Sequence, residues 1–165
     1  MNILKNFTAI RTFIFDMDGV LTDGSLLIFS GNEWLRKMNI KDGYSLQLAV
    51  KKGYRIAIIS GSVSIPVKER LQKLGITDVF MEVADKKEKL LQYITDNGLN
   101  TNEILFMGDD VPDLQAMEIS GLPCCPADAV SEIKQISKYI SPAKGGEGCV
   151  RDVIEKVLKL NNEWY

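Results

Sequence analysis

The sequence predicts an α/β fold in which crossover helices connect the strands of a central parallel sheet. Short runs rich in β-branched and aromatic residues alternate with longer amphipathic segments along the 165-residue chain, as is typical of βα units. Several of these runs end in polar side chains capable of chemistry. In open α/β sheets ligands bind at the carboxyl ends of the strands, so we expect one functional site there.

Composition limits the classes of function. The hydrophobic fraction is 45% and the charged fraction 25%, as in ordinary globular proteins, and a chain of this length is expected to form one domain, residues 1–165. The net charge of -2 argues against a nucleic-acid partner. No apolar run is long enough to span a bilayer, and no signal pattern opens the chain, so the expected location is the cytoplasm.

The titratable side chains limit the chemistry further. The chain has no histidine, which excludes a Ser-His or Cys-His nucleophile and disfavours a zinc hydrolase. Its three cysteines have neither disulfide nor zinc spacing and are expected in the core. Catalysis would therefore depend on carboxylates, lysine, hydroxyls and a hard metal ion.

The elements follow in order from local patterns. A β-hairpin is expected at about 25–39 around the turn Ser30-Gly31-Asn32, and Ser64 is expected to cap a helix that has Pro66 in its first turn. The remaining strands are predicted at 13–15, 55–59, 79–81, 103–107, 122–125 and 139–140, and the remaining helices at 43–52, 86–97, 129–137 and 149–160.

The opening strand ends in the stretch FDMDG, which carries Asp16 and Asp18. Alternate residues of an extended segment share a face, so the two carboxylates can converge beyond the strand. Like charges held this close raise one pKa unless a cation lies between them. The alternative is a plain turn, in which Asp and Gly are common.

Three further sets of polar residues are expected at the same sheet edge: Ser60-Gly61, Lys86, and Asp109-Asp110 with Asp113. Each has a structural alternative, as a turn, a solvated lysine run or an acidic helix cap. Taken together, acidic clusters and a lysine at one edge indicate a ligand site, and the chemistry that fits is phosphoryl transfer with Mg²⁺. One aspartate would attack phosphorus, a second would move the proton, and Lys86 and Ser60 would hold the phosphate oxygens.

The motifs DMDGVLTDG, IISG, Lys86 and GDDVPD resemble the four ordered motifs of the haloacid dehalogenase superfamily of phosphotransferases. The resemblance implies a Rossmann-like three-layer fold with helices on both faces of the sheet. It also implies catalytic roles: Asp16 is the nucleophile, Asp18 is the general acid/base, and Lys86 balances the charge at the nucleophile. Ser60 and Gly61 would bind the phosphate. Asp16, the backbone carbonyl of Asp18 and Asp109 would bind the metal ion, and Asp110 and Asp113 would support these ligands.

The stretches LTDG, GNEWLRKMNIKDG and GGEGCVRDVIEKVL resemble the family of 3-deoxy-D-manno-octulosonate (KDO) 8-phosphate phosphatases, which act in lipopolysaccharide biosynthesis. Members are Mg²⁺-dependent, capless and homotetrameric, and a neighbouring subunit's hairpin and C-terminal tail (about 145–165 here) help to close each site. The short spacing between Ser60 and Lys86 independently leaves no room for a cap domain.

One position does not decide between two sugar acid substrates. The family commonly has arginine where this chain has Ser62, and a relative acting on a nine-carbon keto-deoxy sugar acid (KDN) 9-phosphate tends to have glutamate there, so a nine-carbon substrate is the alternative. Arg70 and Lys73 match substrate-facing positions in these relatives. Arg151, after a glycine loop that is either a hinge or a plain connection, could lie near a neighbouring site.

The sequence also allows other functions and two arrangements of the hairpin. A non-catalytic phospho-accepting domain would also gather aspartates at a sheet edge, although Asp18 and Ser60 argue against the long-lived phosphoaspartate that such a domain needs. A protein phosphatase is disfavoured by the hairpin and tail. The apolar hairpin residues, among them Trp34 and Ile28, could either form an oligomer contact or fold back on the core.

Overall fold

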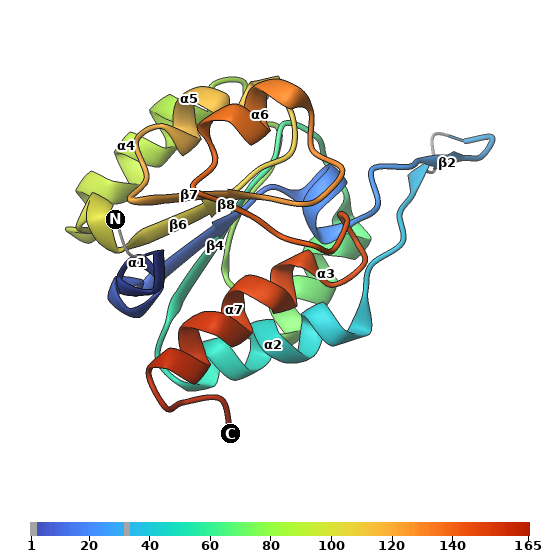
Figure 1. Ribbon diagram of the computed structural model, residues 1–165. Helices are drawn as coiled ribbons and strands as arrows, with labels where there is room; N and C mark the ends of the chain where they lie inside the picture. The colour runs from blue at the N-terminus through green and yellow to red at the C-terminus, as the bar shows by residue number, and fades with distance from the viewer. Residues whose placement is uncertain (1–2, 32–33) are drawn as a thin grey trace.

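The computed structural model describes residues 3–31 and 34–165 and shows a parallel sheet between two layers of helices (Figure 1). Its strand order is β5-β4-β1-β6-β7-β8, and every neighbouring pair is parallel. The predicted Rossmann-like three-layer α/β fold is therefore confirmed. The strands are β1 (Thr12–Phe15), β4 (Arg55–Ile59), β5 (Asp78–Phe80), β6 (Ile104–Met107), β7 (Leu122–Cys125) and β8 (Tyr139–Ile140).

The helices divide between the two faces of the sheet. One layer holds α1 (Ile3–Ala9), α2 (Ile40–Lys51), α3 (Ile65–Lys73) and α7 (Cys149–Leu160), and the other holds α4 (Lys86–Asn97), α5 (Leu114–Met117) and α6 (Ser131–Ile136). Short helical turns lie at Met17–Leu21, Thr101–Glu103 and Val111–Asp113. Among the described residues, no helix combines the length and the apolar character needed to cross a membrane.

The side chains of each strand alternate between the two faces of the sheet and so contribute to two apolar clusters. In β1, Phe13 and Phe15 pack into the larger apolar cluster with α2 and α7, whereas Ile14 packs into the smaller cluster with α4 and α5. Successive strand side chains point to opposite faces, so a strand whose residues are all apolar contributes to both clusters. The cysteines are buried in the core as expected.

Most predicted elements are observed within a few residues of their predicted bounds. The helix expected at 43–52 begins at Ile40, because Asn39 already accepts a hydrogen bond from the Lys41 amide. Ser64 precedes α3 as predicted, but its side chain makes no capping hydrogen bond, so that part of the prediction is wrong. Helix α1 was not expected. Its single buried side chain, Phe7, gives too little periodic pattern to reveal it.

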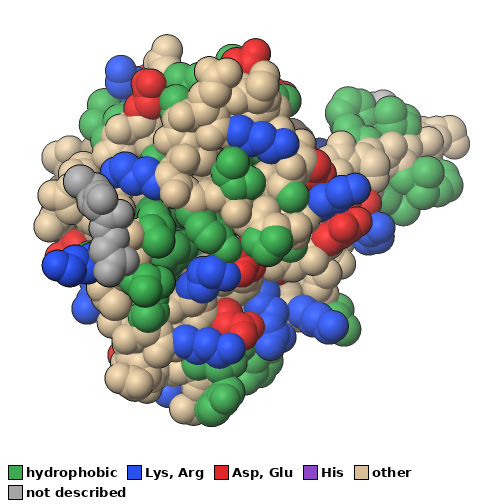
Figure 2. Space-filling view, viewed as in Figure 1, with side chains coloured by type: hydrophobic (Ala, Val, Ile, Leu, Met, Phe, Trp, Pro, Cys, Tyr) green, Lys and Arg blue, Asp and Glu red, His purple; other side chains and the backbone are tan. Residues whose placement is uncertain are grey.

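The hairpin formed by β2 (Leu27–Ile28) and β3 (Trp34–Leu35) projects from the body of the molecule (Figure 1). Ile28 is 65% exposed and Trp34 51% exposed, and Figure 2 shows hydrophobic side chains gathered on the projecting part. Within this chain the hairpin therefore does not fold back on the core. The predicted turn includes Asn32, which lies outside the described residues.

A buried carboxylate joins α2 to α7. Asp42 accepts a hydrogen bond from the Arg151 amide at 2.8 Å, in the first turn of a helix whose N-cap residue, Gly148, has no side chain to do so. The other carboxylate oxygen of Asp42 is buried without a partner among the described residues. Burial raises the pKa of Asp42 to about 6, although the amides of Arg151 and Gly148 act in the opposite direction.

The raised pKa of Asp42 predicts a pH-dependent stability. The carboxyl binds its proton more tightly in the folded state than in the unfolded state, so its contribution to stability is lost as pH rises from about 4 to about 6. In Asp42→Asn this loss, on the order of 2 kcal/mol, should be absent. Urea unfolding of both proteins across that pH range measures it, with the exposed Asp96→Asn as control. Parallel curves for wild type and Asp42→Asn would contradict the prediction.

Candidate active site

Strand β1 delivers Asp16 to the carboxyl edge of the sheet. Asp16 is buried, its amide donates to the Met107 carbonyl at 3.0 Å, and its Oδ1 accepts from the Met17 amide at 2.7 Å. The chain then turns sharply through Asp18 and reaches Gly19 at a φ of 90°. Only glycine adopts this conformation without strain, so the FDMDG stretch fixes both the place of the carboxylate and the tight turn that follows it.

Strand β6, which neighbours β1, ends in the second acidic group. A Cβ on Gly19 would lie 2.0 Å from Asp109 Oδ2, and one on Gly108 would lie 2.4 Å from Asp113 Cβ. The two glycines therefore allow the Asp109 and Asp113 side chains to come close to the backbone. Asp113 Oδ2 accepts from the amides of Asp109 at 3.1 Å and Asp110 at 3.4 Å, and Asp110 and Asp113 form a capping box.

Lys86 reaches this cluster from the start of α4. Its Nζ lies 2.6 Å from Asp113 Oδ1 and 2.9 Å from Asp16 Oδ1, and all three side chains are buried. Burial disfavours the ammonium, but the charges of Asp113 and Asp16 outweigh it and raise the pKa of Lys86 above its ordinary value. The lysine is therefore a fixed positive charge beside Asp16 and not a solvated surface group.

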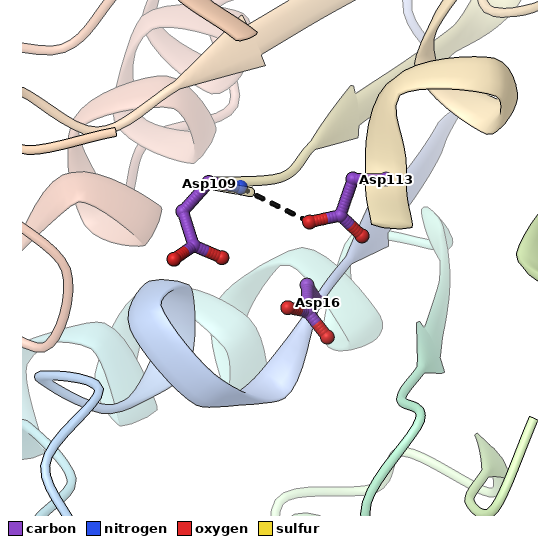
Figure 3. A group of neighbouring side chains, drawn as sticks. All are labelled: Asp16, Asp109 and Asp113. Carbon is purple, nitrogen blue, oxygen red and sulfur yellow. Dashed lines mark hydrogen bonds between the residues drawn. The ribbon is translucent and has the colours of Figure 1, made fainter. Parts of the chain in front are cut away.

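The carboxylates of Asp16, Asp109 and Asp113 face one another across a small space (Figure 3), with one oxygen of each within 4.8 Å of the others. Burial, followed by the charge of a neighbouring aspartate, raises the pKa of both Asp16 and Asp109. Asp109 Oδ1 is buried with no hydrogen-bond partner among the described residues. An all-oxygen set with an orphaned anionic atom suits a hard divalent cation such as Mg²⁺.

Within this set, Asp113 is already committed to other partners. Its two oxygens serve the Lys86 ammonium and the amides that follow β6. Asp16 and Asp109 are therefore the carboxylates with an oxygen left for a metal ion, and the support of the metal shell that the resemblance implies for Asp113 stays a prediction.

Ser60 directly follows the last residue of strand β4 and is buried. Its Oγ accepts from the Ser62 amide at 3.2 Å and lies 3.3 Å from Ser62 Oγ. The Ser62 hydroxyl in turn donates to Asp18 Oδ2. Gly61 is exposed at the same strand end. The structure thus links the predicted phosphate-binding turn to the side chain of the predicted general acid.

A cavity of about 430 Å³ is lined by α2, α3 and the residues that follow β3, and it meets the site at Arg36, which contacts Asp18. Arg70 lines it together with Arg36 and Trp34, so this predicted substrate contact faces a space next to the site. Lys73 lies on the exposed surface of α3 and, among the described residues, is not part of the cavity lining.

The glycine loop before α7 packs on the turn that follows Asp16. A Cβ on Gly145 would lie 1.9 Å from the Gly19 carbonyl oxygen, and the Gly146 amide donates to the Val20 carbonyl at 3.0 Å. Arg151 pairs with Glu155 at 3.0 Å and stacks over the ring of Trp164. The loop is therefore well packed within this chain, and its role as a hinge that brings Arg151 to a neighbouring site stays a prediction.

One residue of the site was missed by sequence reasoning. Arg36, at the base of the hairpin, donates from Nε to Asp18 Oδ1 at 2.6 Å and from Nη2 to Asp18 Oδ2 at 3.2 Å. In the sequence it stands beside Lys37 and resembles an exposed hairpin charge. The signal available was the stretch GNEWLRKMNIKDG, which matched the family without assigning a role to its arginine.

The chain is similar to known hydrolases. The family described as haloacid dehalogenase-like hydrolase matches residues 72–153. The 3-deoxy-D-manno-octulosonate 8-phosphate phosphatase KdsC of Escherichia coli K12 is 32% identical over 157 residues, which cover 95% of this chain and 84% of that protein. The protein of the same name from Yersinia pestis is 31% identical over 159 residues, with the same coverage.

The chain is also similar to solved structures of phosphatases with that name. The crystal structure of the Moraxella catarrhalis 3-deoxy-D-manno-octulosonate 8-phosphate phosphatase in complex with a magnesium ion, a phosphate ion and a KDO molecule matches with a TM-score of 0.94. Its sequence is 31% identical, and the match covers 98% of this chain and 93% of that chain. The Yersinia pestis enzyme matches with a TM-score of 0.95 at 28% identity, over 98% of this chain and 88% of that chain.

The orphaned oxygen of Asp109 predicts a cation-dependent stability. Mg²⁺ should raise the melting temperature of the wild-type protein, because an ion bound only by the folded state stabilises it by about 2.7 kcal/mol at a hundredfold excess over Kd. Asp109→Asn removes one anionic ligand and should lose most of this increase, whereas Asp96→Asn should keep it. Thermal melts with and without Mg²⁺ measure the difference. An equal Mg²⁺ response in Asp109→Asn would exclude Asp109 as a ligand.

Proposed function

The chain belongs to the haloacid dehalogenase-like hydrolase family, with 3-deoxy-D-manno-octulosonate 8-phosphate phosphatases among its relatives, and from this premise we propose that it hydrolyses KDO 8-phosphate to KDO and phosphate with Mg²⁺. The observation that carries the proposal is the buried contact of Asp16 with Lys86 beside Asp109 and Asp113. This arrangement provides a nucleophile, a fixed positive charge and a place for a hard cation.

In the first half of the proposed reaction, an Asp16 oxygen attacks phosphorus. The bond from phosphorus to the sugar oxygen breaks as the bond to Asp16 forms, and Asp18 gives its proton to the departing oxygen. Lys86 balances the charge at Asp16, and Ser60 with nearby backbone amides holds the phosphoryl oxygens. The burial of Asp16 and Lys86 supports these roles, because charges act more strongly where water is excluded.

In the second half, water attacks the aspartyl-phosphate and Asp18 takes its proton. The bond between phosphorus and Asp16 breaks, so that phosphate leaves and both carboxylates return to their starting forms. Asp16, Asp109 and the Asp18 carbonyl would hold Mg²⁺, which when bound offsets the negative charge of the phosphate and the carboxylates. Asp110 and Asp113 would keep this arrangement in place through their capping box.

Phosphate release from a panel of sugar phosphates tests the proposal. The wild-type protein should turn over KDO 8-phosphate with Mg²⁺ and fail to do so with EDTA. Asp16→Asn should lower kcat by at least ~10³, because it removes the nucleophile, whereas Asp96→Asn should leave it unchanged. Full activity in Asp16→Asn would refute the nucleophile assignment.

The same panel separates the alternatives. A faster reaction with the nine-carbon KDN 9-phosphate would replace the proposed substrate by the longer sugar acid. A protein that accepts phosphate from a small donor on Asp16 and then retains it would instead be a phospho-accepting domain.

We further propose that the protein works as a homotetramer in the cytoplasm, where a neighbouring subunit covers the open site. The exposed apolar side chains of the hairpin support an oligomer contact. They are Leu26, Leu27, Ile28, Phe29, Trp34 and Leu35.

Charge introduced on the hairpin should disrupt the assembly. Ile28→Lys places an ammonium on a surface that the contact would bury, and a buried unpaired charge is costly. Light scattering should show the tetramer for the wild type and smaller species for Ile28→Lys, with the exposed Leu91→Lys as control. A wild-type protein that is a fully active monomer would contradict the proposed assembly.

A further inference from the structure

The base of the hairpin carries a buried arginine on an otherwise exposed element. The Arg36 side chain is only 1% exposed, although its neighbours Leu35 and Lys37 are exposed. All of its guanidinium nitrogens donate: Nε and Nη2 to Asp18, Nη2 also to Ser62 Oγ at 3.3 Å, and Nη1 to the Trp34 carbonyl at 3.3 Å.

The bidentate pairing fixes the plane of the Asp18 carboxylate. A guanidinium fork that meets both oxygens of a carboxylate sets its orientation as well as its position. A buried guanidinium needs hydrogen-bond acceptors, and the Asp18 carboxyl group can keep one oxygen on Arg36 while its other oxygen carries the proton. The Asp18 side chain itself is 30% exposed and lies at a sharp turn.

The anchors of Asp18 come from two distant segments. Among the described residues, the hydrogen bonds of its carboxylate come from Arg36, 18 residues along the chain, and from Ser62, 44 residues along the chain. One follows β3 and the other follows β4. The direction in which Asp18 points therefore depends on the hairpin base being in place against the sheet edge.

We propose that Arg36 is a positioning residue that, with Ser62, orients Asp18 and so makes protonation of the leaving group depend on the seating of the hairpin. The inference rests on the proposed role of Asp18 as general acid. It adds a residue outside the four motifs and gives the hairpin a part in the chemistry of its own subunit.

The dependence of kcat/KM on the leaving group tests this role. An alkoxide is a poor leaving group and needs a proton, whereas p-nitrophenolate leaves readily without one. The value of kcat/KM covers the steps up to the departure of the leaving group, so hydrolysis of the phosphoaspartate does not enter it. p-Nitrobenzyl phosphate and p-nitrophenyl phosphate are similar in shape and carry no sugar, so contacts of Arg36 with a sugar cannot explain a difference between them.

The experiment compares kcat/KM for these two phosphates in wild type, Asp18→Asn, Arg36→Met and Ser62→Ala. Arg36→Met should lower the value for p-nitrobenzyl phosphate about 10²-fold and that for p-nitrophenyl phosphate by no more than about threefold. Ser62→Ala should show a smaller loss with the same selectivity, and Arg36→Lys should recover part of the loss. Lys37→Met, which changes the exposed residue next to Arg36 in the chain, should match the wild type.

The outcomes separate the inference from the proposed function. If Asp18→Asn shows no selective loss, the general-acid role fails and the inference fails with it. If Asp18→Asn is selective and Arg36→Met lowers both values equally or neither, the positioning role alone is overturned. Should Arg36→Met fail to fold in a thermal melt, Ser62→Ala decides: a selective loss supports the inference, and its absence overturns it.

Discussion

Three carboxylates share one small buried space beside a single ammonium, and the arrangement of the sheet edge depends on how this excess of negative charge is held. Lys86 contacts Asp16 and Asp113, which leaves Asp109 with an oxygen that has no partner among the described residues. Buried charge is tolerated only when it is paired, protonated or bound to a metal. Burial, followed by the charge of a neighbouring aspartate, raises the pKa of Asp16 and of Asp109, and a divalent ion between them would favour their ionised forms.

The crowding is possible because glycines stand where a Cβ would collide with the acidic side chains. Gly19 allows Asp109 to approach, and Gly145 packs on the Gly19 carbonyl from the other side. Gly148 cannot cap α7 with a side chain, so Asp42 supplies that hydrogen bond from α2. The helix that follows the glycine loop is thus tied to the helix that follows the hairpin, and the loop itself packs on the turn after Asp16.

The parts of the site that follow from local sequence patterns could be predicted. The contacts between segments far apart in the sequence could not. Asp16 and Lys86 could be placed because a strand end and a helix start each have a local pattern, and parallel strands bring these ends to one edge. The contacts of Arg36 with Asp18 and of Asp42 with Arg151 could not be predicted, because they depend on where the hairpin and α7 come to rest. Arg36 has the same local pattern as the exposed Lys37, and only the folded chain distinguishes them.

The hairpin therefore presents two different surfaces. Its outer part exposes apolar side chains, whereas its base buries the Arg36 guanidinium against Asp18. A ribbon with two residues in each strand is marginal by itself, so contacts at either end contribute to holding it in place. Coupling between two such contacts is reciprocal. If a neighbouring subunit binds the outer part of the hairpin, it also favours the contact between Arg36 and Asp18 at the base. Assembly would then orient Asp18 through Arg36, as well as cover the open site.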